Sequence, residues 1–172
     1  KSATDPAERA YYLDMFIDDA TFQIFGSAEE ADLEASIYQA VASGTARSAA
    51  DFDALNQRVF ARYEPRSRVD VDSTDYWARD SLYFTDPLYD VNYLYAGLLA
   101  LRYFTAFEHD PMAFSKNYVA LLQNGFTQPP AALERKFLNI DLDDESGLVR
   151  NANDFINART LVLSRLYATA EK

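Results

Sequence analysis

The sequence predicts an all-α fold: a single helical domain of about six or seven helices, with a long N-terminal helix and a buried, aromatic-rich central helix. Three observations support this. The 172 residues include only 5 Gly and 6 Pro, so there are few breakers to divide the chain into short elements. Apolar residues recur three and four positions apart over several long windows, which is the helical period. Hydrophobic residues make up 49% of the chain, enough for a packed core.

The first helix is expected to begin at Pro6, a residue favoured at the first helical position. Asp5 precedes it as the N-cap, and Glu8 completes the spacing of a capping box. Gly26–Ser27 marks a predicted kink, and Gly44 is the expected C-cap. The apolar positions at helical spacing are Leu13, Phe16, Ile17, Ala20, Ile24, Leu33, Ile37 and Val41.

The second helix is expected to start at Ser48, because Asp51 follows three residues later. Pro65 ends this helix, and Arg66–Thr74 is a predicted polar loop. A short segment follows around Tyr76, Trp77 and Leu82 to Phe84.

The central helix is predicted from Leu88 to Phe107, with Asp86–Pro87 as its cap and first turn. It is apolar nearly all round, which indicates a buried helix. Asp90 and Asn92 are polar residues inside this apolar run. Buried polar groups need partners, so these side chains are expected to face a cleft, a water molecule or each other.

The remaining helices follow from three further start signals. One helix is expected over Asp110–Gly125 and a short one over Pro129–Leu138. Either Asp143 or Asp144 caps the last helix, which carries a long apolar stripe. No segment shows a strand pattern or an internal repeat.

The net charge of −11 excludes several classes of partner. A phosphate backbone would be repelled, so no nucleic-acid partner is expected. No membrane partner is expected either, because anionic lipid repels the chain and no apolar run approaches the roughly 18 residues of a membrane span. Cationic and neutral ligands, including peptides, remain open.

The chain cannot build a zinc site by itself. It has no Cys, a single His109 and no H-E-x-x-H motif, whereas zinc needs several such ligands close together. His109 is interpreted as a helix-end residue. The acidic run Asp141–Glu145 lacks the spacing of a calcium loop and is interpreted as a helix N-terminus.

An unusual feature is the aromatic run that contains Tyr83, Tyr89, Asp90 and Tyr93. Tyr89 and Tyr93 are four residues apart and share one face of a helix. Tyrosine hydroxyls beside a cleft can donate hydrogen bonds to a carbonyl or a developing oxyanion. The alternative is a helix packed by its ring faces, with the hydroxyls at the rim.

At this run the sequence resembles the zinc oligopeptidases that include oligoendopeptidase F and, more distantly, thimet oligopeptidase. In that family a Trp precedes a His-aromatic-Phe turn and a Pro-Phe-Tyr-Tyr-Ile-Asp-Tyr-like helix start. The resemblance continues in order along nearly the whole chain. The matching stretches are residues 21–34, 48–63, 77–101, 110–125 and 129–142.

The resemblance implies that residues 1–172 are the C-terminal helical part of a zinc oligopeptidase-like catalytic domain. The zinc is then expected in the full-length parent, held by an upstream segment with the H-E-x-x-H motif, and no cofactor is expected in this chain. The chain would form the substrate-channel half of an enzyme that hydrolyses short peptides, and would be inactive alone. A cytoplasmic location is expected from the same resemblance. Apolar surface left exposed without the upstream segment is expected to support a homodimer.

Carried over by position, Tyr93 and Tyr89 match tyrosines of the family. Leu82 stands where the family has its His, and Asp90 stands where it has a second Tyr. The residues expected to bind substrate or stabilise the oxyanion are therefore Tyr83, Tyr89, Asp90 and Tyr93. The departures keep two other readings open: a non-catalytic helical binding module or degenerate relative of the family, and an unrelated helical domain whose aromatic residues form its core.

Overall fold

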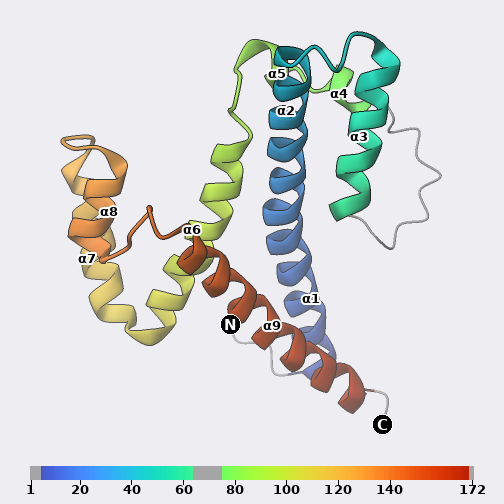
Figure 1. The fold of residues 1–172 in the computed structure, drawn as a ribbon. Helices are drawn as coiled ribbons and strands as arrows, with labels where there is room; N and C mark the ends of the chain where they lie inside the picture. Colours follow the sequence, from blue (N-terminus) through green and yellow to red (C-terminus); the bar gives the residue numbers. More distant parts are fainter. Residues whose placement is uncertain (1–4, 64–74, 171–172) are drawn as a thin grey trace. The chain divides into compact units, whose positions relative to one another are not determined.

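The computed structural model describes residues 5–63 and 75–170 of the chain (Figure 1). Every regular element in these ranges is a helix and none is a strand, so the predicted all-α fold is confirmed. The predicted loop Arg66–Thr74 lies outside the described residues. The elements in chain order are α1 (Pro6–Thr21), the π-helical turn η1 (Phe22–Gly26), α2 (Ser27–Ala42), α3 (Ala49–Tyr63), α4 (Tyr76–Arg79), α5 (Leu82–Thr85), α6 (Val91–His109), α7 (Pro111–Asn124), α8 (Pro130–Leu138) and α9 (Glu145–Ala170).

The long N-terminal helix is confirmed, because α1, η1 and α2 follow one another without a break. The Asp5 carboxylate accepts the N–H of Glu8 at 3.3 Å, as expected of an N-cap. The irregularity predicted at Gly26–Ser27 takes the form of η1, a π-helical turn that ends at Gly26. Gly44 follows the end of α2 with a φ of 70°, a conformation that favours glycine.

Helix α3 begins where Ser48 and Asp51 predict it. The Asp51 carboxylate accepts the N–H groups of Arg47 and Ser48, both at 2.9 Å. These bonds, first that from Arg47, lower the pKa of Asp51. The Asp51 side chain, at the third position of the helix, thus accepts hydrogen bonds from two backbone N–H groups that precede the helix.

The predicted start of the central helix was wrong. Helix α6 begins at Val91, not at Asp86–Pro87. The break falls at Leu88, whose φ of 62° is left-handed and incompatible with an α-helix. The N–H of Leu88 donates to the buried carboxylate of Glu34 at 2.6 Å. This long-range bond outweighs the local signal of a cap followed by proline.

Helices α7 and α8 begin and end as predicted, and α9 begins as predicted. Asp110 caps α7 by accepting the N–H of Ala113 at 3.0 Å, and Gly125, with a φ of 63°, follows its end. Asp144 caps α9 by accepting the N–H of Gly147 at 2.9 Å.

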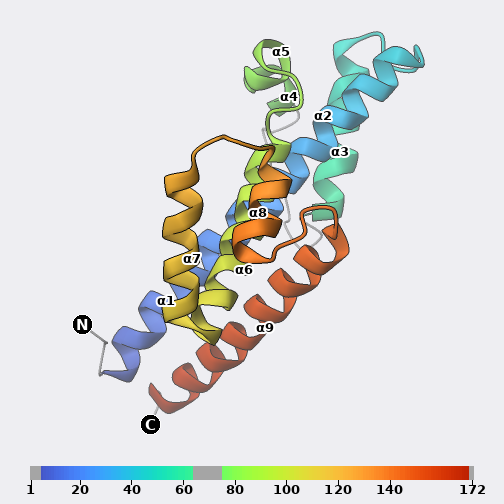
Figure 2. The ribbon, with the colours of Figure 1, turned by 90° about the vertical axis from the view of Figure 1, so that its left-hand side faces the viewer.

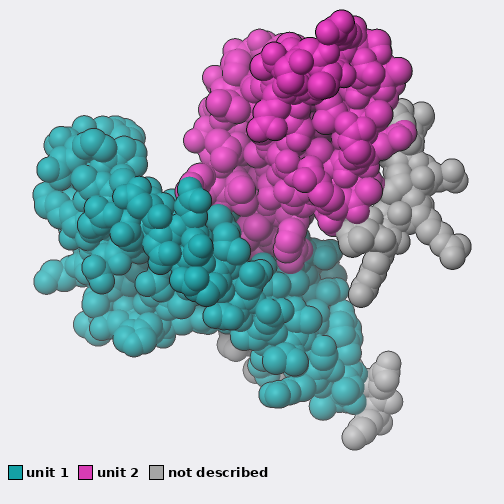
Figure 3. Space-filling model, in the orientation of Figure 1, with its two compact units in different colours: residues 1–18, 97–172 teal, residues 19–96 magenta. Residues whose placement is uncertain are grey.

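The structure divides into two compact units, coloured separately in Figure 3. Unit 1 consists of residues 1–18 and 97–172, and unit 2 of residues 19–96. In unit 2, α2 lies beside α3 (Figure 1), and their contact forms the core of the unit. The core cluster is Leu33, Val59 and Tyr83, with Ile37, Tyr63 and Trp77 packed against it.

In unit 1, an aromatic cluster joins α1, α6 and α9. The ring of Phe155 lies 5.9 Å from Phe16 and 5.5 Å from Phe104 between centroids. The guanidinium carbon of Arg159 lies 3.5 Å from the centroid of the Phe155 ring, a cation–π contact. The same guanidinium donates a hydrogen bond to Glu108. Helices α7 and α8 pack side by side (Figure 2).

Large apolar side chains remain at the surface. Phe22 is 80% exposed, Met112 85% and Phe126 96%. Single exposed apolar side chains also occur on monomeric proteins, so the homodimer stays a prediction. In the described ranges, none of the helices has both the length and the apolar character that crossing a bilayer requires.

Candidate functional site

The four residues singled out by the sequence all lie in unit 2, between α5 and the first turn of α6. The structure separates them into two pairs. The side chains of Tyr83 and Asp90 are buried, at 4% and 2% exposure, whereas Tyr89 and Tyr93 are 39% and 43% exposed. One pair is therefore accessible to a ligand, and the other belongs to the interior of the unit.

The accessible pair consists of neighbouring phenol rings. The centroids of Tyr89 and Tyr93 lie 5.4 Å apart with an angle of 74° between the rings, an edge-to-face contact. The interaction with Tyr89, followed by desolvation, raises the pKa of Tyr93. The Tyr93 hydroxyl therefore keeps its proton at neutral pH and can donate a hydrogen bond. The backbone C=O of Tyr93 accepts the side-chain amide of Gln23 at 3.4 Å, which ties the start of α6 to η1.

Tyr83 connects the segment to the core of unit 2. Its ring packs with Leu33 and Val59, and its hydroxyl donates to the C=O of Glu30 at 3.0 Å. Burial, followed by the charges around it, raises the pKa of Tyr83. The hydroxyl is thus engaged inside the protein, and Tyr83 positions the segment that carries Tyr89 and Tyr93.

Asp90 is buried among other carboxylates. Its pKa rises to about 6, first through desolvation and then through the charges of Asp80, Glu30 and Glu34. Its Oδ2 atom has no hydrogen-bond partner among the described residues. Within residues 5–63 and 75–170, no salt bridge joins a basic side chain to Asp90 or to its three acidic neighbours Asp80, Glu30 and Glu34. Neutralising Asp90 with a proton therefore stabilises this arrangement.

Glu34 is the central residue that sequence reasoning missed. It is 1% exposed, and its Oε1 accepts the N–H of Leu88 at 2.6 Å and the hydroxyl of Tyr38 at 2.7 Å. Burial and the contact with Glu34 raise the pKa of Tyr38 to about 12. The sequence spacing could have indicated this role. Glu34 and Tyr38 are four residues apart and directly follow the apolar positions Leu33 and Ile37, so they lie at the edge of the buried face of the helix.

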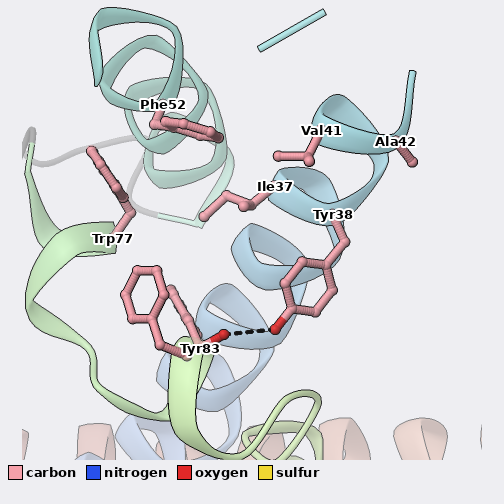
Figure 4. Close-up of a pocket in the computed structure, with 8 residues that line it drawn as sticks. Ile37, Tyr38, Val41, Ala42, Phe52, Trp77 and Tyr83 are labelled. Atoms are coloured by element: carbon pink, nitrogen blue, oxygen red, sulfur yellow. Dashed lines mark hydrogen bonds between the residues drawn. The ribbon is translucent and has the colours of Figure 1, made fainter. Parts of the chain in front are cut away.

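A half-enclosed apolar pocket of about 370 Å³ lies in unit 2, between α2, α3, α4 and α5 (Figure 4). Phe52 and Trp77 form one wall, with ring centroids 4.9 Å apart. Tyr38 and Tyr83 form another wall, where the Tyr38 hydroxyl lies 2.8 Å from the C=O of Tyr83, the contact drawn in Figure 4. The lining residues are Ile37, Tyr38, Val41, Ala42, Phe52, Trp77, Tyr83 and Phe84.

The raised pKa of Asp90 predicts a stability that depends on pH. The folded state binds the Asp90 proton more tightly than the unfolded state does. The stabilisation is therefore fully present below about pH 4 and is lost as the pH rises through about 6. Asp90→Asn keeps a neutral side chain at every pH. We expect it to be more stable than the wild type by up to about 2–3 kcal/mol near pH 8, and no more stable below about pH 4.

The measurement is urea unfolding at these pH values, followed by the fluorescence of Trp77, the single tryptophan of the chain and a residue of unit 2. Asp86→Asn is the matched control, because it removes the same charge from an exposed position in the same turn. Equal pH profiles for the wild type and Asp90→Asn would show that Asp90 titrates normally.

The resemblance places the zinc ligands outside this chain. Among the described residues, no group of three or more His, Cys, Asp or Glu side chains is placed to hold a metal ion. His109 is exposed at the end of α6, as predicted. In the acidic run, Asp144 caps α9, whereas Asp141 and Asp143 pair with Arg135 in the last turn of α8. No protein-family model, curated protein or solved structure matches the chain at a significant level.

Proposed function

We propose that this chain forms one wall of the substrate channel of a zinc-dependent oligoendopeptidase that hydrolyses short peptides. The observation that carries the proposal is the pair Tyr89 and Tyr93, two neighbouring and accessible phenols at positions that match tyrosines of the resembling family. The ordered resemblance along the chain supports the same assignment. The zinc-binding motif belongs to an upstream segment, and a cytoplasmic location is part of this proposal.

The chain's own residues supply substrate binding and stabilisation of charge. The Tyr93 hydroxyl donates to the carbonyl oxygen of the scissile peptide and holds it more strongly as negative charge develops there. The edge contact with Tyr89 fixes the direction of the Tyr93 ring. Glu34 positions the turn before α6 through the N–H of Leu88.

The test compares the isolated chain with the longer natural protein. We expect the longer protein to contain H-E-x-x-H upstream of Lys1, to bind one zinc ion and to cleave an internally quenched short peptide. The isolated chain is expected to do neither, because it lacks the metal ligands. Metal analysis after dialysis and a fluorescence assay of cleavage are the measurements. Tight one-to-one zinc in the isolated chain, or a longer protein without the motif, would overturn the proposal.

The second candidate is a non-catalytic peptide-binding module. Leu82 and Asp90 favour it, because neither supplies the hydrogen-bond donor that the family has at the matching position. The Leu82 side chain cannot donate, and Asp90 is buried. In that case the longer protein lacks the zinc motif and binds the peptide without cleaving it.

A further inference from the structure

The apolar pocket of unit 2 is formed by side chains whose polar atoms are already satisfied. The Tyr38 hydroxyl bonds Glu34, the Trp77 indole N–H donates to Asp53 at 2.8 Å, and the Tyr83 hydroxyl donates to a backbone carbonyl. The other lining side chains are hydrocarbon. A polar or charged group that entered the pocket would lose its hydration and find no partner there.

The charge of unit 2 narrows the choice of ligand further. Residues 19–96 contain 14 Asp and Glu against 6 Lys and Arg, a net charge of −8. Two of these acids, Asp53 and Glu34, bond directly to lining residues of the pocket. A fatty acid or another anionic amphiphile is therefore repelled. The volume of about 370 Å³ lies at the low end of ligand pockets, so the pocket admits a compact apolar group such as a large side chain but not a long ligand.

We propose that this pocket binds the uncharged aromatic or branched aliphatic side chain of a peptide. The peptide as carrier rests on the proposed function, whereas the preference for one uncharged apolar group rests on the pocket alone. The flat faces of Phe52 and Trp77 provide a surface on which such a group packs.

The pocket also connects to the turn that carries the exposed tyrosines. Tyr38 lines the pocket, and its hydroxyl donates a hydrogen bond to Glu34. Glu34 also accepts the backbone N–H of Leu88.

Trp77 makes the proposal directly measurable, because it lines the pocket and is the single tryptophan. The experiment titrates the isolated chain with N-acetyl-leucinamide and excites at the red edge of tryptophan absorption, where tyrosine does not absorb. We expect a saturable change in fluorescence. N-acetylglycinamide lacks the side chain and should give none, and N-acetyl-leucine, which carries a carboxylate, should bind about tenfold more weakly or not at all.

The variant Ala42→Phe fills the pocket and is expected to weaken N-acetyl-leucinamide binding by about tenfold or more. Val41→Phe also fills the pocket, from the neighbouring exposed position. It replaces Ala42→Phe in the test if that variant does not fold. Ala50→Phe, on an exposed face of α3, is the matched control and should bind like the wild type.

Each other outcome overturns a defined part of the proposal. No saturable change with N-acetyl-leucinamide, or the same change in the filled variants, would show that the pocket is not the site. Binding of toluene without binding of N-acetyl-leucinamide would overturn the peptide as carrier. None of these readouts depends on hydrolysis or zinc, so the pocket and the proposed peptidase function can fail independently.

Discussion

Replacing Glu34 by alanine is expected to destabilise unit 2 by about 2–4 kcal/mol. The carboxylate accepts two hydrogen bonds, from the N–H of Leu88 and the hydroxyl of Tyr38, and hydrogen bonds to a charged group contribute about 1.5–3 kcal/mol each. Removing a negative charge beside Asp90 offsets part of this loss. The hydrogen bonds dominate because Leu88 has a left-handed φ that the chain adopts only when other contacts hold it.

Glu34→Gln separates the hydrogen bonds from the charge. Glutamine keeps a carbonyl oxygen as an acceptor and removes the charge, so we expect its stability to lie within about 1 kcal/mol of the wild type. Urea unfolding followed by Trp77 fluorescence measures both variants, with Gln39→Ala on the exposed face of α2 as the control. If Glu34→Gln loses as much stability as Glu34→Ala, the charge itself holds the turn and the hydrogen-bond explanation is wrong.

The features of the fold that the sequence predicted are local ones. Asp51, Asp110 and Asp144 cap helices through backbone donors three or four residues away, so the residue types and their spacing contain the whole interaction. The glycines that follow α2 and α7 need a positive φ, which is also a property of single residues. Periodicity and caps therefore located most helix boundaries.

The features that sequence reasoning missed depend on residues far apart in the chain. The bond between Glu34 and Leu88 spans 54 residues, and it moves the start of α6 from Pro87 to Val91. In the turn that follows this contact, Asp90 is buried near the carboxylates of Glu30 and Glu34 on α2, whereas Tyr89 and Tyr93 are exposed. Local patterns contain no information about which distant acid meets which backbone N–H.

Tyr93→Phe provides the strongest test of the proposed function in the longer protein. We expect kcat to fall by about 10²-fold or more, because the hydroxyl that donates to the developing oxyanion is lost. The melting temperature should hardly change, since the side chain is 43% exposed and the ring that contacts Tyr89 is retained. Kinetics with a short peptide and thermal unfolding of the same preparation are the measurements.

Tyr11→Phe is the matched control, because it removes a phenol hydroxyl from another exposed tyrosine outside the candidate site. It should leave kcat unchanged. Tyr89→Phe separates the two tyrosines: a loss as large as that of Tyr93→Phe would mean that both hydroxyls contact the substrate. Unchanged turnover in Tyr93→Phe together with a lower melting temperature would show that Tyr93 is structural. That result would overturn the assignment of the oxyanion contact to Tyr93, because losing a donor to the developing negative charge must lower kcat.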